Sequence, residues 1–187
     1  QSLINESRSN EKTRILEVID SVTADLVTEL KYTLTDPEEP VRQAAFRLAQ
    51  RLNRPEVNRL LAELARSRDT ELAVAAIDTL GRRKAAGASA TLVELLAPSS
   101  DPEVQIAVCR AMGQIGSSEF IQPLAKILLP GRRWLRRRKY PSQVRIAAAH
   151  AVFRIPGEHT DIMMRALKRD PDERVREAAA FFPFSSS

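Results

Sequence analysis

Val41 opens the stretch VRQAAFRLAQRL, and four later stretches align with it without gaps. They are LAVAAIDTLGRR from Leu72, VQIAVCRAMGQI from Val104, VRIAAAHAVFRI from Val144 and VREAAAFFPF from Val175. We call each of these starting residues an anchor, and successive anchors are 31, 32, 40 and 31 residues apart. Within a stretch, apolar residues recur three, four and eight positions after the anchor, which is the spacing of one helix face. One helical unit therefore recurs along the chain.

Helix-start signals precede the anchors, because a capping carboxylate or a proline stands before each one. They are Asp36-Pro37, Asp69-Thr70, Asp101-Pro102, Tyr140-Pro141-Ser142 and Asp170-Pro171. A second apolar helix follows the first, and these second helices are expected from Pro55, Ala88, Ser118 and His159. An alanine stands three residues after every anchor, and we expect these small side chains to let helices approach closely.

A single helical hairpin cannot bury its apolar side, whereas stacked hairpins share a continuous core. The sequence therefore predicts an all-α fold, a right-handed α-solenoid (superhelix) of about five hairpins. The expected repeats cover about 11–35, 36–67, 68–98, 99–139, 140–169 and 170–183, the fourth carrying an insert at 130–140. They form one expected domain, 11–183, between a flexible segment, 1–10, and a tail, 184–187. The last repeat holds only a first helix, and its aromatic end, Phe181, Phe182 and Phe184, suggests a contact with something else.

The openings of the repeats resemble those of the HEAT-repeat family, in the short HEAT-like form also seen in bilin lyases. The matching residues are Asp101, Pro102, Val104, Ala107, Asp170, Pro171, Val175 and Ala178, with the pairs Val41-Arg42, Val144-Arg145 and Val175-Arg176. The resemblance implies a polar ladder of Asp and Arg between neighbouring repeats, although two copies carry Ala73 and Gln105 where the others carry Arg. It also implies a protein-interaction scaffold. HEAT-like repeats occur in a DNA glycosylase family and in a di-iron hydroxylase as well, so the fold alone does not decide the function.

The sequence offers no catalytic, cofactor or metal set. The motifs GxSxG, GxGxxG, HExxH and the P-loop are absent. One cysteine and two histidines exclude a Cys-based zinc site and leave little for a His-ligated metal. Cys109 falls at a core position and His150 at a surface or half-buried one, while Glu158-His159 precedes a helix without the repeated His-Glu pairs of a hydroxylase. We therefore predict a non-enzyme without a cofactor.

The basic residues are concentrated in one place. The formal net charge is +5, from 29 basic and 24 acidic residues, and six of the basic residues lie in GRRWLRRRKY, 131–140, which has no acid. The remainder has 23 basic and 24 acidic residues, a balance of −1. The candidate binding residues of this insert are Arg132, Arg133, Trp134, Arg136, Arg137, Arg138, Lys139 and Tyr140. They favour an acidic protein surface, with nucleic acid or an anionic membrane as the alternative. A further alternative is that Trp134 and Leu135 pack on the solenoid and the arginines are only solvated.

The second helices supply the other candidate surface, which lines the concave side if the resemblance holds. Its outward residues carry both signs of charge, and the candidates are Arg59, Glu63, Glu94, Lys126 and Arg165, with Arg66, Gln122 and Arg169 beside them. A mixed surface suits a protein interface better than a phosphate backbone, and a merely solvated face is the other interpretation.

Together these features predict a non-catalytic scaffold or adaptor in the cytoplasm, part of a larger bacterial protein or complex. Its expected partner is a protein with an acidic patch. The two alternatives are nucleic-acid or anionic-surface binding through 131–140, and bilin-lyase-like handling of a chromophore. Neither a signal peptide nor a membrane-spanning segment is recognisable in this chain.

Overall fold

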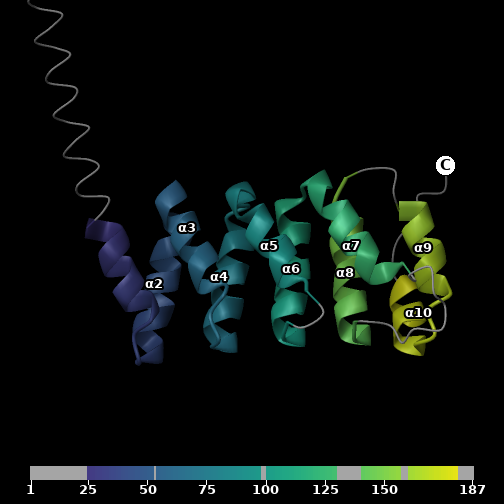
Figure 1. The fold of residues 1–187 in the computed structure, drawn as a ribbon, viewed down its shortest axis with the longest axis horizontal. Coiled ribbons are helices and arrows are strands. Elements are labelled where there is room, and N and C mark those ends of the chain that lie inside the picture. Colours follow the sequence, from purple (N-terminus) through teal and green to yellow (C-terminus); the bar gives the residue numbers. More distant parts are fainter. Residues whose placement is uncertain (1–24, 53, 98–99, 130–139, 157–159, 181–187) are drawn as a thin grey trace, which may run out of the picture. The chain divides into compact units, whose positions relative to one another are not determined.

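The computed structural model describes residues 25–52, 54–97, 100–129, 140–156 and 160–180, and all the regular elements in these ranges are helices (Figure 1). This confirms the all-α prediction. The chain divides into two compact units, Gln1–Leu52 and Asn53–Ser187, which we describe separately. The expectation of one domain over 11–183 stays a prediction.

The first unit contains helical residues 25–34, a turn, and α2 (Glu39–Arg51). Leu30 and Leu34 are buried on the first helix, and so are Ala45 and Ala49 on α2. Asp36 was expected to cap the first turn of α2. It does not, because α2 begins only at Glu39. The Asp36 carboxylate instead shapes the turn, where it accepts the backbone N–H of Glu38 at 2.8 Å.

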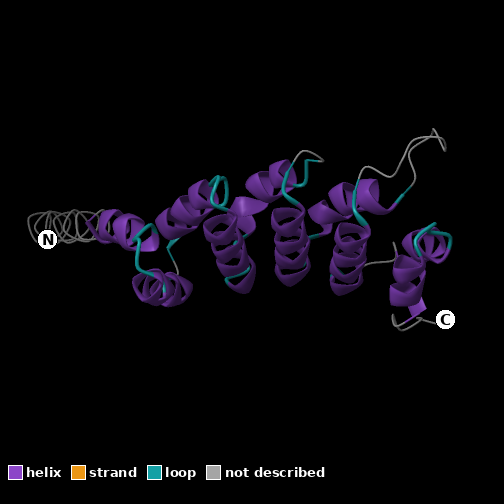
Figure 2. Cartoon of the chain, turned by 90° about the horizontal axis from the view of Figure 1, so that it is seen from below, coloured by secondary structure: helices purple, strands orange, loops and turns teal. Residues whose placement is uncertain are grey.

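The second unit alternates first helices, which contain the anchors, with second helices. The first helices are α4 (Thr70–Arg82), α6 (Pro102–Ile115), α8 (Ser142–Arg154) and α10 (Glu173–Ala180). The second helices are α3 (Pro55–Leu64), α5 (Ser89–Leu95), α7 (Ile121–Leu128) and α9 (Thr160–Lys168). One-turn 3₁₀ helices, η1 (Ala86–Ala88) and η2 (Ser118–Phe120), lead into α5 and α7. Figure 2 shows the first helices of this unit as one row and the second helices as a row beside it.

Side-chain capping explains where two of the first helices, α4 and α6, begin. Asp69 accepts the N–H groups of Glu71 and Leu72 at 3.0 and 3.2 Å, and Asp101 accepts that of Glu103 at 2.8 Å. These two predicted helix starts are confirmed. Asp170 behaves like Asp36 instead, since it lies in the turn and α10 begins at Glu173. Gly116 ends α6 with a φ of +73°, a conformation that a residue without a Cβ adopts readily.

Neighbouring first helices pack against each other, α4 on α6 and α6 on α8. The tightest approaches shown are at glycines. A Cβ on Gly81 would lie 2.8 Å from Cα of Ala111, and a Cβ on Gly113 would lie 2.9 Å from Cα of Ala151. The alanine three residues after the anchor is less consistently packed than we expected, because Ala44 is exposed. Close packing therefore depends on Gly facing Ala in these two pairs.

The rows also enclose the core of the second unit, where apolar side chains of both helix types meet. Val108 and Met112 of α6 are fully buried, and so are Phe120 and Leu124 from the following second helix. No described helix is both long enough and apolar enough to cross a membrane.

Candidate functional site

The outward face of the second helices carries a row of equivalent charged residues. Glu63, Glu94 and Lys126 each lie 22 residues after the anchor of their repeat, and all three are exposed. Arg59 on α3 and Arg165 on α9 are exposed as well. All five second-helix candidates are thus exposed, and three of them, Glu63, Glu94 and Lys126, stand at equivalent positions of successive second helices.

Part of this charge is paired between repeats. Arg66 of the α3 repeat donates from Nη2 to Glu94 Oε2 of α5 at 2.6 Å and from Nε to the same oxygen at 3.2 Å. The Arg66 hydrogen bond and charge lower the pKa of the Glu94 carboxyl below its usual value. Arg59 has only a loose ion pair with Glu56 at 3.7 Å, on its own helix. The surface therefore contains one charge pair that joins two repeats, Arg66 with Glu94, beside a looser pair within α3.

Exposed apolar side chains on the same helices were missed by sequence analysis. Val93 of α5 is 40 % exposed and Ile162 of α9 is 60 % exposed, while Leu129 after α7 is 36 % exposed. Aligning the repeats could have identified Ile162 as exposed. It stands 18 residues after its anchor, where other repeats carry the polar residues Arg59 and Gln122. Apolar groups beside mixed charges are typical of a protein interface.

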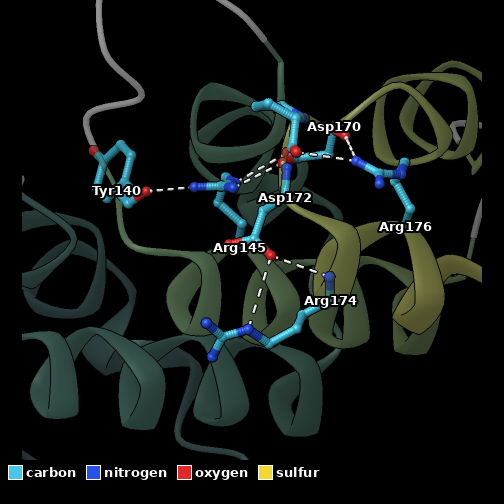
Figure 3. A network of polar contacts seen from close by, with 7 residues as sticks. Tyr140, Arg145, Asp170, Asp172, Arg174 and Arg176 are labelled. Carbon is cyan, nitrogen blue, oxygen red and sulfur yellow. Dashed lines mark hydrogen bonds and ion pairs between the residues drawn. The ribbon is translucent and has the colours of Figure 1, made fainter.

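A buried ion pair links the last three helices (Figure 3). Arg145 of α8 donates from Nη2 to Asp170 Oδ1 at 2.7 Å and from Nε to Asp170 Oδ2 at 3.0 Å. Both side chains are almost completely buried. Nη1 of Arg145 donates to the carbonyl oxygen of Tyr140 at 2.7 Å, so this side chain ties the turn before its own helix to the turn before α10.

Other polar contacts cross the repeats on their exposed side. Arg110 of α6 makes a bidentate ion pair with Asp78 of α4, with Nη2 at 2.8 Å from Oδ1 and 2.9 Å from Oδ2. Ser89 donates to Glu119 at 2.7 Å, and Thr70 donates to Asp101 at 3.3 Å. At the Gln105 position the arginine of other copies is replaced by an amide, which donates to the Ala97 carbonyl at 2.6 Å. Polar links thus join neighbouring repeats, although not always through the expected Asp and Arg.

Comparison with protein families agrees with this architecture. HEAT repeats match residues 26–100 and, in overlap, 57–140, which together exceed half of the chain. The chain belongs to the HEAT-repeat family. HEAT repeats generally act as protein-interaction scaffolds. No curated protein matches this HEAT-repeat chain, and the bilin-lyase subtype stays a prediction.

Most of the basic insert of this HEAT-repeat protein lies outside the described residues, namely Arg132, Arg133, Trp134, Arg136, Arg137, Arg138 and Lys139. Tyr140 is described and is half-buried. Burial raises the pKa of its hydroxyl above the usual value, and the nearby Cys109 acts in the same direction. The role of the insert in binding stays a prediction.

Two other chemically active side chains, Cys109 and His150, are placed as the sequence indicated. Cys109 is fully buried on α6, and burial raises the pKa of its thiol to about 12. His150 is exposed on α8. Glu158 and His159 lie outside the described residues. Within the part of the chain that the structure describes, no three His, Cys, Asp or Glu side chains are grouped so as to hold a metal ion.

Proposed function

We propose that this HEAT-repeat chain is a non-catalytic scaffold or adaptor that binds a protein through the outward face of its second helices. The observation that supports this is the combination, on α5, α7 and α9, of exposed Val93 and Ile162 with exposed charges. Such a surface can bury apolar area at its centre and keep a polar rim. A cytoplasmic role within a larger bacterial protein or complex is part of the same proposal.

The partner surface is acidic where it meets α7 and α9. Lys126 and Arg165 are exposed there, and within the described ranges neither forms an ion pair with a carboxylate. In contrast, the α3–α5 end carries Glu63 and Glu94, the latter paired with Arg66. Complementary charge at one end of an interface speeds association and fixes orientation.

The test is a crosslinking pull-down from the source cell, followed by affinity measurement with the protein captured. Lys126→Glu combined with Arg165→Glu should weaken binding by about tenfold or more, mostly through slower association at low salt. Arg82→Glu and Arg154→Glu together make the matched control, because they reverse the same amount of charge on exposed ends of first helices. Equal weakening by both double variants, or turnover of a substrate by the isolated chain, would contradict the proposal.

Nucleic-acid or anionic-surface binding through 131–140 is the competing outcome. It requires that affinity fall steeply with salt, with a log–log slope of about −0.9 for each phosphate contact on duplex DNA. The variant with Arg136, Arg137 and Arg138 changed to Ala should then flatten that slope, whereas the second-helix variants should leave it unchanged. An absorbance shift on mixing with a bilin would instead support chromophore handling.

A further inference from the structure

The first helices of the second unit have an outer face, opposite the side that they bury. On α6, Glu103, Ile106 and Arg110 stand three and four residues apart, so their side chains lie on one face of the helix. Glu103 and Arg110 are exposed, whereas Val108 on the opposite side is fully buried. Arg110 also reaches Asp78 of α4 at 2.8 Å, so the outer faces of these two neighbouring helices adjoin (Figure 2).

A row of β-branched apolar residues crosses this outer face. Two residues after their anchors stand Val74 on α4, Ile106 on α6 and Ile146 on α8, and we call these three residues the outer row. All three are half-buried, so each still exposes part of its surface. The repeat does not require an apolar residue at this position, because α2 has an exposed Gln43 there and α10 an exposed Glu177. The outer row is therefore a particular property of three consecutive first helices.

Acidic charge borders the outer row on one side. Glu71 and Glu103 each stand three residues before the outer-row residue of their helix, and both are exposed. In the part of the chain that the structure describes, neither forms an ion pair with a cation. On the other side of the row, Asp78 and Arg110 neutralise each other through their bidentate contact. The surface around the outer row on α4 and α6 is thus negative, which suits a partner with a cationic edge.

The spacing of the outer row fits an α-helix that lies across the first helices. Packed helices are about 8–10 Å apart, and residues seven apart on one side of an α-helix are separated by about 10.5 Å. A β-strand covers about 10 Å in three residues, but the third side chain then points to the opposite face. An α-helix is also about 10–12 Å wide, close to the about 10.5 Å between the levels of Glu103 and Arg110 along α6. One helix can therefore contact the apolar row and its acidic border together.

We propose that the outer row is a second docking surface, on which this chain binds an amphipathic α-helix of a partner protein. Apolar side chains seven residues apart on that helix pack on Val74, Ile106 and Ile146. Lysine or arginine residues along one edge of the helix lie beside Glu71 and Glu103 and fix which edge faces the starts of the first helices. The proposal does not depend on the protein bound by the second helices, and an adaptor with both surfaces joins two partners.

Photocrosslinking from the outer face tests what docks there. The full 187-residue chain is prepared with a benzophenone amino acid in place of Glu103, is irradiated in an extract of the source cell, and the crosslinked peptide is sequenced by mass spectrometry. The same replacement of Glu63, exposed on α3, is the matched control. Only the Glu103 probe should reach a segment with apolar residues seven apart and basic residues along one edge. A proline-rich segment with an apolar residue every third position, another part of this chain, or no crosslink overturns the proposal.

The sequenced segment then serves as a synthetic peptide whose affinity is measured by fluorescence anisotropy. Val74→Gln combined with Ile106→Gln should weaken binding at least tenfold, because two apolar contacts are lost. Glutamine is chosen because Gln43 occupies the same repeat position. The matched control, Val93→Gln combined with Ile162→Gln, removes exposed apolar groups from the second helices and should leave this affinity unchanged. Equal effects of the two double variants overturn the proposal.

Two further measurements examine the helix and its charge. The circular dichroism of the peptide should become helical on binding, and an unchanged spectrum overturns the proposal. Glu71→Gln combined with Glu103→Gln should weaken binding and reduce its dependence on salt, whereas Glu63→Gln should not. Thermal melts check the folding of each variant, and Ile146→Gln replaces any outer-row variant that melts earlier than the unchanged chain. The protein bound by the second helices should respond only to the Val93 and Ile162 variant, so failure of either proposal leaves the other standing.

Discussion

Lys84 ends α4 in a left-handed conformation that glycine usually occupies. Its φ is +52°, its N–H bonds to the carbonyl of Gly81 at 2.9 Å, and the N–H of Ala85 bonds to that of Leu80 at 3.0 Å. These two bonds define a Schellman motif, in which a side chain with a Cβ is strained. Lys84→Gly should therefore raise the free energy of unfolding by about 0.5–1 kcal/mol in urea denaturation.

Gly116 provides the comparison, because it takes the same conformation with no atom near the place of a Cβ. Gly116→Ala should lower the free energy of unfolding by about 1 kcal/mol through backbone strain alone. If Lys84→Gly instead lowers the free energy of unfolding, the lysine side chain stabilises the fold by more than its left-handed backbone conformation destabilises it.

Cys109 should make the protein less stable in alkaline solution. Its thiol titrates near pH 9 in a model compound but near 12 in the fold, because burial disfavours the thiolate. Between these values the unfolded chain has lost the proton and the folded chain has kept it, so the free energy of unfolding falls as pH rises, by about 1 kcal/mol per pH unit. Urea melts from pH 7 to 10 should show this decline.

The same burial predicts that Cys109 reacts slowly with a thiol reagent. A rise of three pH units in pKa lowers the thiolate fraction about 1000-fold at pH 8. Labelling should accelerate in denaturant to the rate of a free thiol. Cys109→Ala should reduce the loss of stability at alkaline pH. Tyr140→Phe should reduce it further, because burial also raises the pKa of the Tyr140 hydroxyl. Rapid labelling of the folded chain would contradict the buried position.

At the scale of elements, the contact between first helices depends on two glycines. Gly81→Ala and Gly113→Ala should each lower the free energy of unfolding by about 1–3 kcal/mol, because the added Cβ would overlap backbone atoms of Ala111 or Ala151. Gly87→Ala is the control, as no atom lies within 4 Å of its Cβ position. Chemical denaturation measures the free energy of unfolding of all three variants. An unchanged value for Gly113→Ala would mean that α6 and α8 can move apart without loss of stability.

The ion pair of Arg145 with Asp170 should be strongly coupled. Arg145→Met leaves a buried carboxylate without its cation and should cost about 3–5 kcal/mol. Asp170→Asn keeps an acceptor for the Asp172 N–H, so the double variant should be less destabilised than the sum of the two single ones. A double-mutant cycle in urea measures this coupling. Additive effects would show that Arg145 acts through the Tyr140 carbonyl alone.

Sequence periodicity could predict the helices but not all of their beginnings. Asp69 and Asp101 cap the helices that they precede, whereas Asp36 and Asp170 lie in turns further upstream. At both of these turns an arginine of the following helix, Arg42 or Arg176, donates back to the turn carbonyls. A contact of this kind depends on side-chain direction as well as on spacing, so the local pattern does not reveal it.

For the molecule as a whole, the sequence predicted the row of second-helix charges because repeat register alone determines which positions face outward. It did not predict which charges are paired. Arg66 reaches Glu94 across 28 residues, and Arg110 reaches Asp78 across 32. Whether such residues meet depends on how far one helix is shifted along its stacked neighbour. The repeat length in the sequence does not give this shift. Exposed Ile162 was missed for a simpler reason, since a helical apolar pattern counts it as core.

In a stack of repeats each element is stabilised only by its neighbours, so protection of backbone amides should vary along the second unit. Helix α6 packs between α4 and α8, whereas the main contacts of α10 among the described helices are with α8 and α9. Amides of α6 should therefore exchange slowest and those of α10 fastest. Gly113→Ala should accelerate exchange most in α6 and α8 and least in α3. Hydrogen exchange by mass spectrometry measures this gradient, and uniform acceleration would indicate that the unit opens as a single cooperative body instead of repeat by repeat.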